Sequence, residues 1–182
     1  FLDVGSEVGI GSLLRNFLAG DDVLGLILER AGQMVALFWL GAMIGRFVGA
    51  ALLARLPAGW LLAGVACVAA GLCLAVSQMT GPIAGYLALG VGLFNAIMFP
   101  TIFTLTLQRS SAPAPATSGL LCMAIVGGAV LPYIAGRIAD ATGNLHMAFL
   151  VPLLGYLGIV VFAVTAARKA GGSAAPAPFA GH

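Results

Sequence analysis

A few polar side chains interrupt otherwise apolar stretches, and these are the candidates for chemistry. Glu7, Ser12 and Asn16 lie in the first apolar stretch, and Asn95 lies in the fourth. Carboxylate and amide groups of this kind can bind the hydroxyls of a polar solute. If the stretches cross a membrane, an ionisable group such as Glu7 must face the protein interior or a wet cavity, because exposure to lipid costs several kcal/mol. We therefore expect the first and fourth stretches to line a central cavity.

Two arginines offer partners for Glu7. Arg15 lies eight residues further along, just over two helical turns, so both side chains can share one helix face, and Arg46 lies in the next stretch. Glu7 could contact a solute, couple an ion, or form a structural hydrogen bond between helices. Arg46 could reach the lipid headgroups, or it could pair with a carboxylate or a helix end as part of a gate. The sequence leaves these alternatives open.

Glycine and proline positions say how the helices meet and bend. Gly41, Gly45 and Gly49 recur every fourth residue. This spacing places them on one helix face and lets another helix approach closely, so we expect a packing role. Pro100 frees a backbone carbonyl one turn earlier, which is tolerated where protein or water satisfies that group. Pro100 is thus either a simple kink or a functional bend.

The composition indicates an integral membrane protein. Of the 182 residues, 61% are hydrophobic and only 8% are charged, and the mean hydropathy is +1.10. Soluble domains carry about 25% charged residues. Only helices and closed barrels satisfy their backbone groups in lipid, and the continuous apolar stretches of roughly 20 residues are typical of helices. We predict an all-α integral membrane protein.

Turn residues divide the chain into six transmembrane segments. The predicted segments are 1–19, 31–54, 60–76, 83–107, 117–139 and 146–167. The third and sixth have almost no polar side chains and are expected to face lipid. Residues 1–167 should thus form one six-helix bundle. Its first helix is expected to lack its opening turns, because the chain begins at Phe1 inside an apolar stretch. Residues 168–182 are small and proline-rich and predict a disordered cytoplasmic tail.

The distribution of basic residues predicts the orientation. Six spans place both termini on one side of the membrane. Cytoplasmic loops carry an excess of lysine and arginine, so cytoplasmic termini are expected. The side of the termini holds Arg55, Arg109, Arg168 and Lys169, against Arg30 and Arg137 on the other side.

Other chemistries lack the residues they need. The chain has no GxGxxG or GxxxxGK[ST] motif for nucleotides, and its two histidines, His146 and His182, are isolated in the sequence. Cys67, Cys73 and Cys122 lie inside apolar runs without a CxxC spacing. The net charge of +2 is too small to indicate nucleic-acid binding. We expect no enzyme activity, no cofactor and no metal site.

Four stretches, in order along the chain, resemble helices of one transporter family. Residues 92–103 (GLFNAIMFPTIF) resemble the tenth helix of the fucose/glucose/galactose–proton symporter family, within the major facilitator superfamily. Residues 118–129 (SGLLCMAIVGGA), continuing to 136–140 (GRIAD), resemble the eleventh helix. Residues 5–12 (GSEVGIGS) and 38–47 (FWLGAMIGRF) resemble the seventh and eighth. Residues 1–167 therefore resemble helices 7–12, the C-terminal half of such a transporter.

The resemblance implies a fold and a set of site residues. In this superfamily two six-helix bundles rock around a midplane site and expose it to each side in turn. The seventh and tenth helices line the cavity, while the ninth and twelfth face lipid. The resemblance implies that Glu7, Asn16, Trp39 and Asn95 face the sugar path and that Arg46 takes a gate position. The family's proton-coupling carboxylates are expected in the N-terminal half, which is missing from this chain.

The function implied by the resemblance is proton symport of a hexose such as glucose, galactose or fucose by alternating access. The chain would act as the C-terminal half of a larger, multi-pass transporter in the bacterial inner membrane. Its partners would be the sugar, protons, the lipid bilayer and the missing six-helix half. The alternative is a non-transporting membrane fragment or assembly partner from a split or truncated gene.

Overall fold

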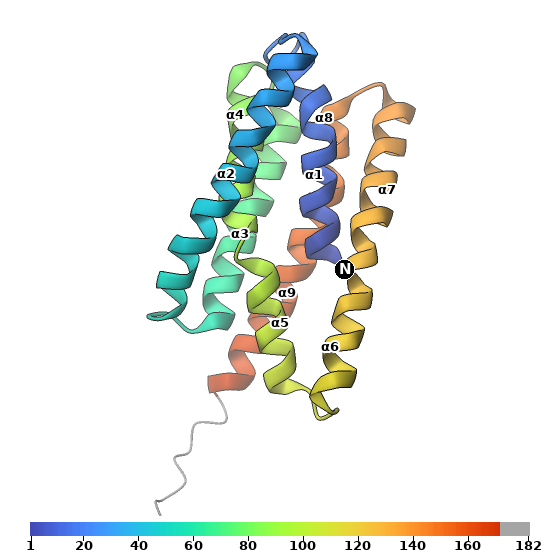
Figure 1. The fold of residues 1–182 in the computed structure, drawn as a ribbon. Helices are drawn as coiled ribbons and strands as arrows, with labels where there is room; N and C mark the ends of the chain where they lie inside the picture. The colour runs from blue at the N-terminus through green and yellow to red at the C-terminus, as the bar shows by residue number, and fades with distance from the viewer. Residues whose placement is uncertain (172–182) are drawn as a thin grey trace, which may run out of the picture.

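The chain folds as a bundle of helices that run back and forth between two ends (Figure 1). The computed structural model describes residues 1–171, which form helices and turns and, within that range, no strand. In chain order the elements are α1 (Leu2–Ala19), α2 (Leu28–Leu53), α3 (Ala58–Gln78), α4 (Pro82–Asn95), α5 (Met98–Arg109), α6 (Ala114–Met123), the 3-10 turn η1 (Ala124–Val126), α7 (Gly127–Thr142), α8 (Leu145–Ala148) and α9 (Leu150–Gly171).

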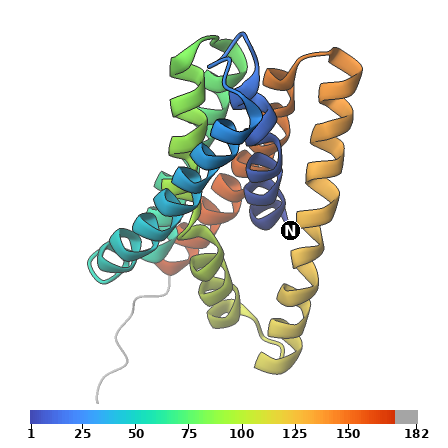
Figure 2. The same cartoon turned by 45° about the horizontal axis from the view of Figure 1, so that its top comes forward.

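Among residues 1–171, five segments are long and apolar enough to cross a membrane. α1 is shorter, at 18 residues, and is more polar because it carries Asp3, Glu7 and Arg15. It nevertheless lies inside the bundle, packed against α2, α4, α7 and α9 (Figure 2). The predicted all-α membrane fold is thus confirmed, with α1 as a short central sixth helix. The five apolar segments are Leu28–Leu53, Ala58–Gln78, Pro82–Arg109, Ala114–Thr142 and Leu145–Arg168.

Three of the predicted spans are interrupted helices. The span predicted as 83–107 ends its first helix at Asn95 and begins the second at Met98. Pro100 is the third residue of α5, where its missing N–H removes no helical hydrogen bond, because the first turn has no intrahelical partners for its donors. Pro100 therefore helps to begin a helix after a break, rather than bending a continuous one. The other breaks are η1, between α6 and α7, and Phe149, between α8 and α9.

Most predicted spans begin or end a few residues away from the observed helices. α2 was predicted to begin at residue 31 but begins at Leu28, so Glu29 belongs to its first turn. α9 continues to Gly171, so residues 168–171 are helical and not part of a disordered tail. The remainder of that predicted tail, 172–182, lies outside the described residues.

Small residues let α2 and α4 cross closely. A side chain on Gly45 would meet the backbone carbonyl of Leu93, and one on Gly49 would meet the Ile97 side chain. The Cβ position of Gly41 lies 3.6 Å from the Leu93 amide nitrogen. The three glycines thus face the end of α4 and the break that follows it.

The two helices predicted to face lipid, α3 and α9, each have one exposed face with apolar side chains. Their other faces are buried and pack against each other, with Gly59 of α3 within about 3 Å of Ala167 of α9 when a Cβ is added. The outward faces carry exposed apolar side chains, among them Val68, Leu154 and Val161. Apolar side chains on an outward face have lipid as their solvent in a membrane protein.

Candidate functional site

A cavity of about 340 Å³ lies where α1, α2 and the α4–α5 break meet. It brings together three of the residues singled out from the sequence: Glu7, Arg46 and Pro100. The acidic side chain of Glu7 and the basic side chain of Arg46, far apart in the chain, thus line the same cavity. Such an arrangement can bind a solute that offers both hydrogen-bond donors and acceptors. The full lining is Val4, Glu7, Arg46, Ala96, Phe99, Pro100 and Ile125.

Of the two arginines that could accompany Glu7, Arg46 is the one close to it. The Arg46 guanidinium exerts an attractive charge interaction on the Glu7 carboxylate, although the described residues form no direct ion pair between them. Arg15 turns away, and its Nε donates to the backbone carbonyl of Leu28 at 3.2 Å. Glu7 is half-buried and Arg46 is exposed, so Arg46 retains hydrogen-bond donors for a solute.

Asn95 lies behind this cavity, at the end of α4. Its side chain is 1% exposed, and its Oδ1 accepts a hydrogen bond of 3.1 Å from the Tyr156 hydroxyl. Its Nδ2 has no hydrogen-bond partner among the described residues, but it lies close enough to Glu7 to stabilise the carboxylate. An amide with its oxygen engaged and its nitrogen free offers a donor toward the Glu7 side of the bundle.

Three predicted site residues lie outside the cavity, on exposed faces of α1 and α2. Ser12 and Asn16 are exposed, and the Ser12 Oγ donates to the Gly9 carbonyl of its own helix at 2.9 Å. Trp39 is 48% exposed, and its ring lies 3.2 Å from the Cβ position of Gly11 on α1. These side chains form an open surface beside α1 instead of lining the cavity with Glu7.

Sequence reasoning overlooked the role of Tyr156. Its helix, α9, was predicted to hold almost no side chain able to bind anything, yet Tyr156 is fully buried and bonds to Asn95. A buried tyrosine hydroxyl usually finds a partner. A single tyrosine in the middle of an apolar helix was therefore the available signal.

His146 is isolated in the sequence but not in the fold. Its Nδ1 lies 2.7 Å from the carbonyl oxygen of Val76 and its Nε2 lies 3.1 Å from Oδ2 of Asp22. The ring also packs edge-on against Phe17. His146 thus connects the α1–α2 loop, the end of α3 and α8. Within residues 1–171 no three histidine, cysteine, aspartate or glutamate side chains gather as a metal site would need.

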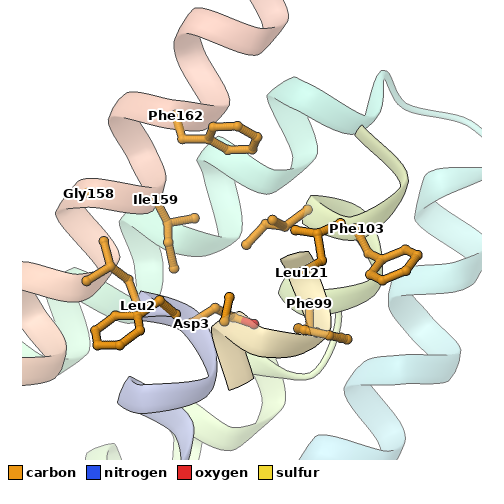
Figure 3. A pocket seen from close by; sticks show the side chains of 11 residues that line it. Leu2, Asp3, Phe99, Phe103, Leu121, Gly158, Ile159 and Phe162 are labelled. Carbon is orange, nitrogen blue, oxygen red and sulfur yellow. The ribbon is translucent and has the colours of Figure 1, made fainter. Parts of the chain in front are cut away.

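A second cavity, of about 220 Å³, lies between the start of α1 and helices α5, α6 and α9 (Figure 3). Its lining is apolar and rich in phenylalanine, except for the carboxyl group of Asp3. Phe99 lines both cavities.

No protein-family model matches the chain. It is 45% identical over 169 residues to a glucose/galactose transporter of Brucella abortus, a match that covers 93% of this chain and 41% of the relative. It is 39% identical to a putative glucose/galactose transporter of Helicobacter pylori and 31% identical to the L-fucose-proton symporter of Escherichia coli. The chain therefore spans about two-fifths of the length of the relatives it matches.

The fold has close counterparts among solved structures. The crystal structure of the major facilitator superfamily transporter FucP in the outward conformation matches with a TM-score of 0.85 and 30% identity, over 91% of this chain and 40% of that one. A second crystal structure, of a single-substitution variant of the Escherichia coli fucose:proton symporter, matches with a TM-score of 0.87 and 28% identity. By sequence and by fold, the chain is therefore similar to about two-fifths of the length of major facilitator superfamily sugar transporters such as these.

Proposed function

We propose that the chain is the C-terminal half of a transporter that moves a hexose such as glucose, galactose or fucose together with protons, by alternating access. The relatives named as glucose/galactose transporters and as an L-fucose-proton symporter support the substrate class. In this proposal the chain supplies one wall of the sugar site, and a second six-helix half supplies the other.

The observation that supports this function most directly is the cavity shared by Glu7 and Arg46. A hexose presents hydroxyl groups that both donate and accept hydrogen bonds, and an acid beside a base meets both needs. Asn95 adds an amide donor from behind the cavity. Trp39, half-exposed on α2, offers an aromatic face for the apolar edge of a sugar ring.

The proposal is tested in proteoliposomes that contain this chain joined to its six-helix N-terminal half. Labelled glucose, galactose and fucose are supplied with and without an imposed proton gradient, and accumulation that requires the gradient is expected for at least one sugar. Absence of gradient-driven accumulation for all three would contradict the transport proposal. It would favour a non-transporting fragment or assembly partner.

The variant Asn95→Leu tests whether Asn95 contributes to the proposed sugar site. The substitution removes the free amide donor and should weaken sugar binding about tenfold, the value of one hydrogen bond of about 1.4 kcal/mol. Gln108→Leu serves as the control, because Gln108 is exposed near the end of α5. Equal binding by the parent and the Asn95 variant would remove Asn95 from the site.

We also propose a bacterial inner-membrane location with cytoplasmic termini. The α2–α3 and α5–α6 connections lie at the same end of the bundle as the end of α9 (Figure 1). That end holds Arg55 and Arg109, as the positive-inside rule requires of a cytoplasmic side. Single cysteines at these two positions, in a chain with its native cysteines replaced, should resist a membrane-impermeant thiol reagent in intact cells and react after permeabilisation.

A further inference from the structure

A groove of about 300 Å³ runs beside the first half of α3, between the α2–α3 connection and Phe94 near the end of α4. It shares no lining residue with the cavity of Glu7 and Arg46, so it is separate from the proposed sugar site. Among its lining side chains only the Trp60 indole carries a polar group. A sugar bound there would leave most of its hydroxyls without partners. The groove therefore suits an apolar chain.

The groove is open on its outer side. α3 lines it with Trp60, Leu61, Gly64, Val65 and Val68, whose spacing places them on one helix face. Trp60 is 54% exposed and Val68 is 43% exposed, and nothing lies within 4 Å of the Cβ position of Gly64. α3 is one of the segments long and apolar enough to cross a membrane. An open apolar groove on such a helix has lipid as its solvent.

The length of the groove favours an acyl chain as its occupant. Its lining extends along the chain from Pro57, directly before α3, to Val68 near the middle of that helix. At 1.5 Å per residue this is about 16 Å along the helix axis. Half of the hydrocarbon core of a bilayer is about 15 Å thick. The groove thus reaches from the end of a span to the middle of the membrane, which is the depth of one acyl chain in one leaflet. A partner transmembrane helix would need a contact surface along the whole of α3.

The end of the groove carries a positive charge without a counter-ion. Arg55 directly precedes the lining residue Leu56, it is exposed, and no ion pair forms with it among residues 1–171. The acidic residues of the chain lie on α1, in the α1–α2 loop, at the start of α2 and near the end of α7. None belongs to the α2–α3 connection. Basic side chains at the end of a span attract anionic headgroups, and tryptophan is enriched at the same level of the membrane.

We propose that this groove binds one phospholipid with an anionic headgroup. Its phosphate lies at Arg55 and accepts a hydrogen bond from the Trp60 indole nitrogen, and one of its acyl chains lies along α3 past Gly64 to Val68. What distinguishes this site from ordinary contact with the bilayer is its preference for an anionic lipid over a zwitterionic one. The proposal does not depend on sugar transport.

The first test uses quenching of Trp60 fluorescence by lipids with brominated acyl chains. The chain contains two tryptophans, Trp39 and Trp60, so Trp39→Phe leaves Trp60 as the only one. This protein is placed in phosphatidylcholine bilayers with increasing fractions of brominated phosphatidylglycerol or brominated phosphatidylcholine. Half-maximal quenching should require an about fivefold smaller fraction of the anionic lipid, the effect of one basic side chain near an anionic headgroup. Equal fractions for the two lipids would overturn the proposal.

Two variants in the same background test the two ends of the site, each with a matched control. Arg55→Gln should abolish the preference, whereas Arg109→Gln, an exposed arginine outside the groove, should keep it. Gly64→Leu fills the groove and should also abolish the preference. Gly71→Leu should keep it, because Gly71 lies on the same helix with equally open space but outside the groove. A preference that survives Arg55→Gln or Gly64→Leu, or that is lost equally in the controls, would contradict a site at this groove.

A second experiment examines the parent protein joined to a six-helix N-terminal half, so that it depends on no variant. Phosphatidylglycerol with a photoreactive diazirine in the middle of one acyl chain is activated by light, and the attached peptide is identified by mass spectrometry. We expect attachment within residues 60–68, and unlabelled phosphatidylglycerol should compete better than phosphatidylcholine. Absence of attachment there would mean that protein covers the groove and would overturn the proposal. Because no sugar is present, this outcome is separate from that of the transport assay.

Discussion

The crossing of α2 and α4 gives a sharp prediction for Gly45→Ala. A Cβ atom at position 45 would collide with the carbonyl oxygen of Leu93 and lie 2.9 Å from its carbonyl carbon. Both atoms belong to the backbone of α4, so they cannot move aside as a flexible side chain could. The two helices must separate instead. Overpacking of this kind typically costs about 1–3 kcal/mol.

Gly90→Ala is the matched control on the partner helix. Gly90 lies inside α4, and nothing lies within 4 Å of its Cβ position. There the added methyl group meets no clash, and alanine is favoured over glycine in a helix by up to about 1 kcal/mol. Gly45 also lies inside a helix, so this gain is common to both variants, and they should differ in stability by the overpacking cost of about 1–3 kcal/mol.

The assay is reversible unfolding of the purified protein in mixed micelles, followed by far-ultraviolet circular dichroism. Gly45→Ala should unfold at a lower denaturant concentration than the parent, and Gly90→Ala should unfold at the same or a higher one. If the two variants are equally stable, then α2 and α4 do not cross at Gly45 as described, and the reasoning fails.

Two further changes test hydrogen bonds between side chains by the same unfolding assay. Tyr156→Phe removes the donor to Asn95 and leaves an amide oxygen buried without a partner, so a loss of about 1–2 kcal/mol is expected; Tyr133→Phe, at a 68% exposed position, should change nothing. Asp22→Asn removes the charge that faces His146, but the Asp22 side chain is 60% exposed, so solvent limits the expected loss to about 1 kcal/mol or less. A loss above about 2 kcal/mol for the Asp22 variant would mean that this contact is far better shielded from water than its exposure indicates.

The sequence singled out candidate site residues only where a polar side chain interrupts an apolar stretch. Glu7 stands out in α1 because a carboxylate in an apolar stretch is costly unless it faces protein or water. Its pairing could not be read in the same way, since Arg15 and Arg46 were equally available in the sequence. In the fold Arg46 lines the same cavity as Glu7, while Arg15 bonds to the backbone carbonyl of Leu28 at the start of α2. Trp39 lies against Gly11 of α1 but outside this cavity.

By itself, the sequence determined that the chain is a helical membrane protein with about six spans, because hydropathy acts over each stretch of about 20 residues and needs no knowledge of its neighbours. Only the tertiary structure decided which polar groups meet. Tyr156 reaches Asn95 across 61 residues of chain, and His146 reaches Asp22 across 124. It also decided that the fourth span breaks after Asn95, where α4 lies against the glycines of α2. Such contacts depend on how each helix is rotated and packed against its neighbours, which no local pattern of residues specifies.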